Sequence, residues 1–325
     1  MALPHPATDD PLAEPRIAVL IPCYNEAGAI GQVIRDFRSQ LPEARIYVFD
    51  NGSTDRSVEE ARQGGAIVRH EPRRGKGYVI RSMFRQVSAD AYIMVDGDAT
   101  YPAERVHELL RPILSGEADM VIGSRLLAGS SSRFKVLNLM GNQGFRFLLN
   151  SLFRVRVTDL LSGYRVMNRR LVKSLPFFSR GFESETELTV KCLARGYRIV
   201  EIPVVLAPRP EGTRSKIHIV RDGLLILDTI FALARDYKPL TAFGLVGLLL
   251  IGIGLIPGVV VIHGYLVTGL VRHFPLAILA VGLVLSGLVS IFTGLVLHSI
   301  ARHFQELDYQ MQELLDIRSG GSRAG

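Results

Sequence analysis

The sequence predicts an α/β domain with a mostly parallel sheet, followed by interfacial amphipathic helices and a two-helix transmembrane hairpin. Two observations lead to this fold class. In the first half of the 325-residue chain, short apolar runs rich in β-branched residues alternate with helical patterns, which is typical of a parallel α/β sheet. Further along, residues 239–271 and 273–301 contain no Asp, Glu, Lys or Arg, which is typical of membrane-spanning helices.

Residues 1–15 are expected to form a disordered leader. They contain three acidic residues and four prolines but no apolar run, so the hydrophobic region of a signal peptide is missing. The domain that follows is therefore expected on the cytosolic side. The two cysteines, Cys23 and Cys192, imply no disulfide framework, as expected in a reducing compartment.

Five strands and four helices are expected to alternate between residues 16 and 122. The strands cover residues 16–21, 46–49, 66–69, 91–95 and 120–122, and the helices cover residues 27–39, 55–63, 77–87 and 103–114. Polar residues follow three of these strands, at residues 22–26, 50–55 and 96–98. Because the carboxyl ends of parallel strands meet at one edge, where open α/β sheets bind ligands, we expect a nucleotide site there.

The pair Asp96 and Asp98 is the clearest sign of chemistry at this edge. Two carboxylates that close repel each other unless a cation lies between them. Mg²⁺ or Mn²⁺ is usually held by one or two carboxylates together with phosphate oxygens. The alternative is a polar turn in which Asp98 or Thr100 caps the helix that begins near Pro102. Residues 50–53 and 73–77 have alternatives of the same kind, a capped turn and a solvated basic loop.

Residues 242–262 and 274–297 are expected to form a transmembrane hairpin, because each stretch reaches the length of about 20 residues that crosses a hydrocarbon core. The alternative is a pair of buried helices in a soluble core, but such helices rarely lack charge on every face. Arg235, Lys238 and Arg302 flank the hairpin, which favours a cytosolic location for both ends. We attribute the excess of 38 basic over 31 acidic residues to lipid headgroups and phosphate ligands, and expect no nucleic-acid partner.

A cationic loop precedes the hairpin. Residues 208–216 combine prolines and a glycine with Arg209, Arg214 and Lys216, and the largely apolar residues 217–237 suit a helix in the membrane interface. The loop would then hold its cations at the height of the lipid headgroups, where a lipid phosphate arrives. Nonspecific attraction to anionic lipid is the alternative, and it needs no fixed geometry.

Taken in order, these motifs resemble those of the family-2 glycosyltransferases with the GT-A fold, and among them the polyprenyl-phosphate sugar transferases that include dolichol-phosphate mannose synthase. The resemblance runs from about residue 16 to the end of the hairpin. The matching segments are residues 21–26, 50–55, 75–77, 96–98, 123–125, 159, 162–165 and 215–216, which read IPCYNE, DNGSTD, GKG, DGD, GSR, D, SGYR and SK.

The resemblance implies a role for each group of residues. Nucleotide binding is implied for Pro22, Tyr24, Glu26, Asp50, Lys76 and Asp96. Metal binding is implied for Asp98 and Asp96, and catalysis for Asp96, Asp98, Arg125 and Glu187. Binding of the lipid phosphate is implied for Arg125, Arg209, Arg214, Ser215 and Lys216.

Two positions depart from the family pattern. Asn51 stands where a second aspartate is commoner, which leaves the base open, and Thr100 stands where related enzymes offer a longer amide, which leaves the third protein ligand of the metal open. Glu185 and Glu187 both fall where the family places acidic residues around the donor sugar. For either glutamate the alternative is a solvated helix start.

The resemblance and the chemistry of the substrates predict metal-dependent transfer of a sugar from a UDP- or GDP-linked donor to undecaprenyl or dolichyl phosphate. A phosphomonoester has a second pKa of about 6, so the acceptor oxygen is already ionised at neutral pH and needs no strong general base. A single in-line displacement inverts the anomeric carbon, which gives a β-linked product from an α-linked donor.

Three other functions are alternatives to this one. Processive polysaccharide synthases carry a Gln-x-x-Arg-Trp motif, and this chain contains no tryptophan. A nucleotidyltransferase that forms the nucleotide sugar would not need two membrane spans. A non-catalytic scaffold, or a homo-oligomer of the enzyme, would use the three-to-four spacing of Ile300, Phe304, Leu307, Met311 and Leu314, which suits an interhelical seam.

The expected domain order follows from these predictions. A leader covers residues 1–15, a GT-A catalytic domain residues 16–216, interfacial helices residues 217–238, the hairpin residues 239–300, and a cytosolic helix and tail residues 301–325. The whole chain is expected to be an integral membrane protein, in the plasma or inner membrane if it is bacterial.

Overall fold

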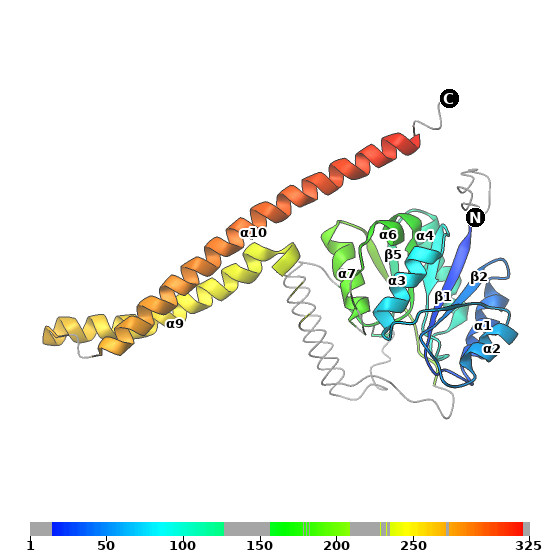
Figure 1. Ribbon diagram of the computed structural model, residues 1–325, viewed down its shortest axis with the longest axis horizontal. Coiled ribbons are helices and arrows are strands. Elements are labelled where there is room, and N and C mark those ends of the chain that lie inside the picture. Colours follow the sequence, from blue (N-terminus) through cyan, green and yellow to red (C-terminus); the bar gives the residue numbers. More distant parts are fainter. Residues whose placement is uncertain are drawn as a thin grey trace. The chain divides into compact units, whose positions relative to one another are not determined.

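The computed structural model describes residues 15–126, 157–208 apart from 178, 180 and 182, the single positions 228 and 232, and residues 235–270 and 273–320. The chain divides into two compact units, Met1–Thr229 and Ile230–Gly325. The first unit contains the sheet and the second contains two long helices (Figure 1).

A seven-stranded sheet in the order β3-β2-β1-β4-β6-β5-β7 forms the centre of the first unit. β1 pairs in parallel with β2 and β4, β2 with β3, and β5 with β7, whereas β6 is antiparallel to β4 and β5. The strands are β1 (Ile17–Cys23), β2 (Arg45–Asp50), β3 (Ile67–His70), β4 (Ala91–Met94), β5 (Met120–Ser124), β6 (Arg165–Asn168) and β7 (Ile199–Pro203).

Because β6 is antiparallel to its neighbours, the residues that precede it lie at the carboxyl edge of the sheet. β4 and β5 are both antiparallel to β6, so they run in the same direction as β1. The residues just before β6, up to Tyr164, therefore lie at the same edge as the ends of the parallel strands. The five predicted strands occur within a few residues of their expected bounds. β6 and β7 were not predicted, because β6 is short and begins and ends with polar residues, and β7 contains Glu201.

Helices cover both faces of the sheet. They are α1 (Ile30–Gln40), α2 (Ser57–Gln63), α3 (Lys76–Gln86), the 3-10 helix η1 (Ala103–Arg105), α4 (Val106–Leu114), α6 (Arg169–Ser174) and α7 (Ser184–Ala194). α1, α2 and α4 contribute side chains to one core cluster, while α3 packs with α6 and α7. α1 begins three residues later than predicted, because Gly28 takes a left-handed conformation with φ of 85°.

Successive side chains of a strand point to opposite faces of the sheet, and in the central strands β4 and β5 all of them are buried. Val19, Ile93 and Val121 point into the cluster with α1, α2 and α4. Their neighbours Leu20 and Tyr92 are equally buried but lie outside that cluster, on the face that α3 and α6 cover. Both faces are thus apolar, which leaves the carboxyl edge of the sheet as the place for polar side chains.

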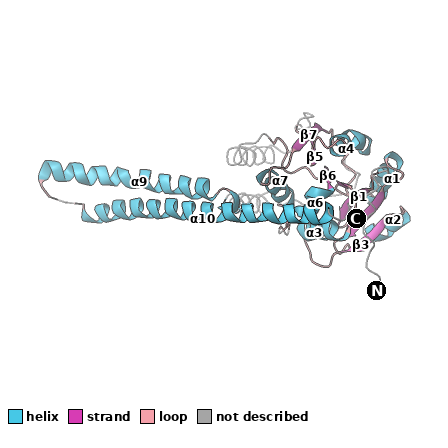
Figure 2. Cartoon of the chain, turned by 90° about the horizontal axis from the view of Figure 1, so that it is seen from above, coloured by secondary structure: helices cyan, strands magenta, loops and turns pink. Residues whose placement is uncertain are grey.

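The second unit is an antiparallel helical hairpin of α9 (Pro239–Thr268) and α10 (Phe274–Gly320), which lie side by side in both views (Figures 1 and 2). Their segments Pro239–Thr268 and Phe274–Phe304 are long and apolar enough to cross a membrane. Only 11% of each hydrophobic window is buried, whereas a core helix of a soluble protein is mostly buried. The helix break is a glycine, Gly269, in the left-handed conformation that ends α9.

Glycines bring the two helices into backbone contact. A Cβ atom on Gly247 would lie 2.6 Å from the carbonyl oxygen of Gly287, and the reverse distance is also 2.6 Å. The same seam includes Gly254, packed on Leu283, and Gly294, packed on Phe243. Small residues that allow close approach are typical of packed helices in membranes. α10 extends well beyond the predicted second span at residues 274–297 and continues without a break to Gly320.

Candidate active site

The end of β4 carries an acidic side chain that is bound to a lysine. Asp96 Oδ1 lies 2.6 Å from Nζ of Lys76, the first residue of α3. The same ammonium group lies 2.6 Å from Oε1 of Glu185 on α7. Burial opposes the charge of Lys76, but the carboxylates of Asp96 and Glu185 outweigh it and hold the pKa of Lys76 above its usual value. The three residues form one ion-pair cluster, called here the Lys76 cluster.

Gly163 is the reason that Asp96 fits where it does. A Cβ atom at this position would lie 2.2 Å from Asp96 Oδ2 and 2.6 Å from its Cγ. Gly163 also donates its backbone N–H to the hydroxyl of Tyr101 at 2.9 Å. Any side chain at Gly163 would therefore displace the carboxylate, and the segment before β6 is shaped around it.

Asp98 is buried two residues beyond Asp96. Its Oδ1 accepts hydrogen bonds from the hydroxyl of Thr100 at 2.6 Å and from the Thr100 backbone N–H at 3.2 Å. The turn alternative from the sequence is thus partly true, since Asp98 does bind its own turn. Ala99 between them has a φ of 57°, a left-handed conformation that is uncommon for alanine.

The donor set fits a divalent ion that brings further ligands of its own. Within the described residues, no group of three or more His, Cys, Asp or Glu side chains could hold a metal ion. Asp96 and Glu185 carry two negative charges against the single positive charge of Lys76. Mg²⁺ and Mn²⁺ prefer such oxygen ligands, and Mg²⁺ commonly completes its shell with substrate phosphates. Asp98 and Asp96 are the residues that would hold it.

The loops after β1 and β2 are joined by hydrogen bonds. Asn25 accepts from the backbone N–H of Thr54 at 2.8 Å and donates its own N–H to Ser53 Oγ at 3.0 Å. Glu26 donates its N–H to Ser57 Oγ at 2.7 Å. These contacts place the predicted nucleotide residues Pro22, Tyr24, Glu26 and Asp50 at neighbouring strand ends.

Asp50 is buried and heavily hydrogen-bonded. Its two oxygens accept from the backbone N–H groups of Gly52 and Ser53, each at 3.0 Å, and Oδ2 lies 3.0 Å from Nδ1 of His70. Burial raises the pKa of this carboxyl, but the bonds from Ser53, His70 and Gly52 outweigh it, so the pKa lies below its usual value. Asp50 is therefore ionised and fixed in orientation at neutral pH.

Asn51, which departs from the family pattern, ties down the loop before α3. Its amide nitrogen donates to the carbonyl oxygens of Glu71 and Arg73, at 2.9 and 2.7 Å. Its amide oxygen accepts from the backbone N–H of Gly75 at 2.7 Å. An aspartate could accept but could not donate, so only an amide can make all three bonds. Asn51 thus fixes the residue directly before Lys76.

The arginines of this loop lie against tyrosines. The guanidinium carbon of Arg74 lies 4.6 Å from the ring centre of Tyr24, and that of Arg73 lies 4.8 Å from the ring centre of Tyr78. Arg73 is also bound to the buried Glu71, with Nε to Oε1 at 2.7 Å. The basic loop is therefore not simply solvated, and Tyr24, which is 39% exposed, is not a core residue.

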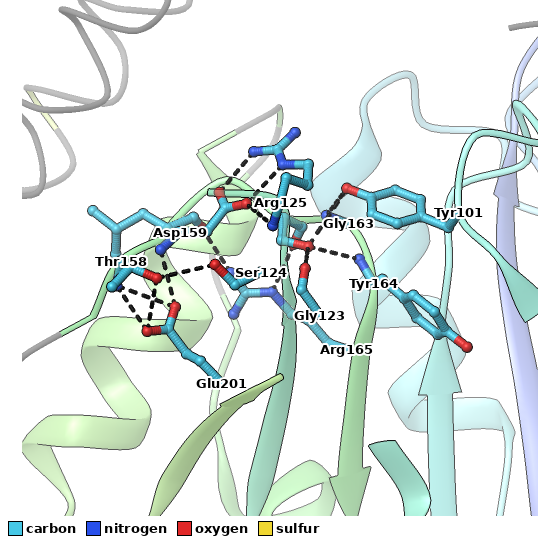
Figure 3. A network of polar contacts seen from close by, with 12 residues as sticks. Tyr101, Gly123, Ser124, Arg125, Thr158, Asp159, Gly163, Tyr164, Arg165 and Glu201 are labelled. Atoms are coloured by element: carbon cyan, nitrogen blue, oxygen red, sulfur yellow. Dashed lines mark hydrogen bonds and ion pairs between the residues drawn. The ribbon is translucent and has the colours of Figure 1, made fainter. Parts of the chain in front are cut away.

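Arg125 is held by Asp159, which the sequence matched to the family pattern without assigning it a role (Figure 3). Nε and Nη2 of Arg125 donate to the two oxygens of Asp159, both at 2.7 Å. Asp159 is fully buried, and its backbone N–H donates to Glu201 Oε1 at 2.9 Å. Burial opposes the charge of Arg125, but Tyr101 and Asp159 outweigh it and raise its pKa. Asp159 in the motif before SGYR was the only sequence signal for this pair.

The structure separates the two glutamates of α7. Glu185 contacts Lys76 and also accepts from the hydroxyl of Ser184 at 2.9 Å. Glu187, which was expected to be catalytic, is paired with Lys191 one turn further along and accepts from the backbone N–H of Ser179 at 2.6 Å. Both are buried, so neither is a solvated helix start. Glu185 is the glutamate that α7 brings to the Lys76 cluster.

Four predicted residues lie outside the described part of the chain. They are the lipid-phosphate candidates Arg209, Arg214, Ser215 and Lys216, and most of the predicted interfacial segment, residues 217–238, lies outside it as well. The remaining predicted residues all lie on β1, β2, α3, α7 or the segments that follow β1, β4 and β5.

The sequence matches one protein-family model and several known proteins. Residues 18–175 match the glycosyl transferase family 2 model. A glycosyltransferase of Haloferax volcanii, AglJ, is 32% identical over 92% of this chain and 98% of its own length. A dolichyl-phosphate hexose transferase of the same organism is 30% identical over 61% of this chain and 86% of its own. An undecaprenyl-phosphate mannosyltransferase of Micrococcus luteus is 26% identical over 70% and 98%.

Solved structures share the fold. Glucosyl-3-phosphoglycerate synthase from Mycobacterium tuberculosis, in complex with Mn²⁺, UDP-glucose and phosphoglyceric acid, superposes with a TM-score of 0.55 at 25% sequence identity. The match covers 67% of this chain and 79% of that one. The mostly parallel sheet with helices on both faces is thus shared with an enzyme crystallised with a nucleotide sugar and a divalent ion.

Proposed function

Because the chain belongs to glycosyltransferase family 2, we propose that it transfers a hexose from a nucleotide sugar to a polyprenyl phosphate at a membrane surface. The observation that carries this proposal is the Lys76 cluster beside Asp98 at the carboxyl edge of the sheet. The acceptor class is supported by the two relatives named for dolichyl and undecaprenyl phosphate and by the two apolar helices.

In this proposal the donor binds across the ends of β1, β2 and β4. Pro22, Tyr24, Glu26 and Asp50 contact the nucleoside, and Asp98 with Asp96 holds Mg²⁺ or Mn²⁺ beside the diphosphate. When bound, such an ion neutralises charge that develops on a leaving diphosphate. The complex of Mn²⁺ and UDP-glucose in the similar solved structure supports a metal and a UDP donor, although a GDP donor uses the same chemistry.

Glu185 is proposed to contact the donor sugar, in place of Glu187. Its carboxylate is oriented by Lys76 and by Ser184, and it comes from the same cluster as Asp96. Glu187 keeps the beginning of α7 in place through Lys191 and Ser179. The sequence prediction named Glu187 as catalytic, and on these contacts we propose its neighbour two residues earlier for the donor sugar.

The acceptor phosphate is proposed to meet Arg125 and the cationic residues Arg209, Arg214, Ser215 and Lys216. Asp159 fixes the orientation of Arg125, so its positive charge is placed before any substrate arrives. The ionised phosphate oxygen then attacks the anomeric carbon opposite the departing diphosphate, which gives inversion. The catalytic unit works at the cytosolic face, with α9 and α10 in the membrane.

The test is to incubate membranes that contain the full chain with polyprenyl phosphate and a panel of UDP- and GDP-linked sugars. We expect one β-linked glycolipid, identified by mass and by its anomeric configuration, together with release of a nucleoside diphosphate. Release of inorganic diphosphate would instead identify a nucleotidyltransferase. No turnover with any donor would favour a scaffold.

Substitution of Asp98 tests the site itself. Asp98→Ala should lower the rate of glycolipid formation by more than about a hundredfold, because the residue would no longer contribute to charge stabilisation at the diphosphate. The control is Glu43→Ala, an exposed acidic residue in the turn between α1 and β2. Both variants should unfold at temperatures close to that of the unmodified protein. Full activity in Asp98→Ala would remove Asp98 from the mechanism.

A further inference from the structure

Lys76 lies between two carboxylates that come from separate elements. Its ammonium nitrogen is 2.6 Å from Asp96 Oδ1 and 2.6 Å from Glu185 Oε1. The Lys76 and Glu185 side chains are only 14% and 4% exposed, whereas Asp96 is 30% exposed. One positive charge thus joins the start of α3, the end of β4 and the start of α7 at the point where β4 meets Asp98.

The position of this ammonium group is fixed by its surroundings. Asn51 accepts the N–H of Gly75, the residue before Lys76, and so anchors the start of α3. On the opposite side, Gly163 packs directly against Oδ2 of Asp96. Ser184 donates to the second oxygen of Glu185 at 2.9 Å. Each member of the cluster therefore has a separate contact that holds it toward the other two.

The charge balance around Lys76 has a consequence for binding. Asp96 and Glu185 supply two negative charges, each 2.6 Å from the same ammonium nitrogen, and Lys76 compensates one of them. Without Lys76 the two carboxylates would favour a metal ion bound by protein alone and would repel the diphosphate of a nucleotide, since charges a few ångströms apart interact strongly at a partly buried site.

We propose that Lys76 is a positioning residue that acts as an internal counter-ion, so that the donor site takes up the divalent cation together with the nucleoside diphosphate rather than the cation alone. The identity of these ligands rests on the proposed function. Other charged groups face the same carboxylates: Arg125 lies toward Asp96, and the buried Arg165 lies toward Glu185. They stay unchanged in every variant of the test and therefore cancel in the comparison.

The test is a series of variants that changes the charge of the cluster in steps. Lys76→Met keeps a long unbranched side chain and leaves both carboxylates of the cluster uncompensated. Glu185→Gln leaves none uncompensated. The double variant Lys76→Met with Glu185→Gln leaves one, as in the unmodified protein. The full chain in detergent micelles is titrated with Mn²⁺ alone, and separately with UDP and GDP in the presence of EDTA.

The proposal gives opposite orders for the two titrations. Mn²⁺ alone should bind about tenfold or more tightly to Lys76→Met and correspondingly more weakly to Glu185→Gln, with the double variant close to the unmodified protein. The nucleoside diphosphate that binds should rank in the reverse order. A purely structural role for Lys76 would weaken both ligands in all three variants, and that result would overturn the proposal.

Thermal unfolding of each variant shows whether that variant is folded. The double variant and Lys76→Met both lack the ammonium group and differ only in the charge at residue 185, so a difference in their Mn²⁺ affinity reports the charge balance. If the double variant binds Mn²⁺ as tightly as Lys76→Met does, the counter-ion role is wrong. The titrations do not depend on turnover. Failure to form a glycolipid would therefore contradict the proposed function while leaving this result interpretable.

Discussion

At the scale of single residues, the site depends on positions that accept only one kind of side chain. Asn51 needs both a donor and an acceptor, Gly163 must have no side chain, and Asp159 must offer two acceptor oxygens to Arg125. The sequence identified Asp96 and Asp98 because two acids at a strand end are unusual in a pattern of apolar strands. It placed both Glu185 and Glu187 at the donor sugar and assigned catalysis to Glu187. Side chains two residues apart on a helix point in directions about 200° apart, and only packing decides which of them reaches Lys76.

Gly163→Ala should disable the donor site with little effect on the fold. The new methyl group would lie 2.2 Å from Asp96 Oδ2, so the carboxylate must move away and its 2.6 Å contact with Lys76 is lost. We expect nucleotide affinity to fall by more than about tenfold, equivalent to about 1.4 kcal/mol. The control is Gly31→Ala in α1, where the nearest atom is a flexible arginine nitrogen at 3.4 Å. Equal nucleotide binding by both variants would contradict the role of Gly163.

Glu71 should make the stability of the first unit sensitive to acid. Hydrogen bonds from Arg73, which outweigh the effect of burial, lower the pKa of Glu71 from 4.5 to about 2. Because the folded-state pKa is below the unfolded one, the stabilisation is complete above about pH 4.5 and is lost as the pH falls toward 2. Unfolding temperatures measured across this range should fall less steeply in Glu71→Gln than in the unmodified protein. The exposed Glu117→Gln should leave the slope unchanged.

At the scale of elements, the sequence predicted the strands whose apolar runs are continuous and missed those that carry polar residues for the site. β6 begins at Arg165, which is completely buried yet bound to the carbonyl oxygens of Leu160 and Ser162 and to the hydroxyl of Thr189. A buried arginine with only neutral hydrogen-bond partners has no signature in hydrophobic periodicity. The two spans were predicted because they contain no charged residue, and this signal does not depend on the periodicity of apolar positions.

The glycine seam of the hairpin should be sensitive to position. Gly287→Leu places a side chain where even a Cβ atom would lie 2.6 Å from the Gly247 carbonyl, so α9 and α10 must separate. We expect destabilisation of about 1–3 kcal/mol, as in other overpacked sites. Gly282→Leu lies on the same helix with nothing within 4 Å of its Cβ and should be tolerated. Reversible unfolding in mixed micelles measures both, and equal losses would argue against a packed seam.

At the scale of the whole molecule, the chain combines a catalytic unit with a helical hairpin, and α10 extends past the end of the membrane segment. The span Phe274–Phe304 ends well before the helix does, at Gly320. Gly294 already packs against the first residues of α9, so α10 continues beyond its partner helix. Ile300, Phe304 and Leu307 on this continuation are 47%, 68% and 56% exposed. In sequence they continue at Met311 and Leu314 with the spacing of a coiled-coil seam.

A second copy of the chain would cover this seam in a parallel arrangement, because both copies insert in the membrane with the same orientation. Leu307→Cys should then form a disulfide-linked dimer under mild oxidation, visible on a non-reducing gel. Glu306→Cys is the matched control. Glu306 is next to Leu307 in the chain but is not one of the seam residues, and it pairs with Arg302 and His303 on its own helix. The native thiols should not interfere, because burial raises the pKa of Cys23 to about 12 and Cys192 is also buried. Equal cross-linking at residues 306 and 307 would indicate random collision, and no cross-linking at either would contradict a parallel dimer through this seam.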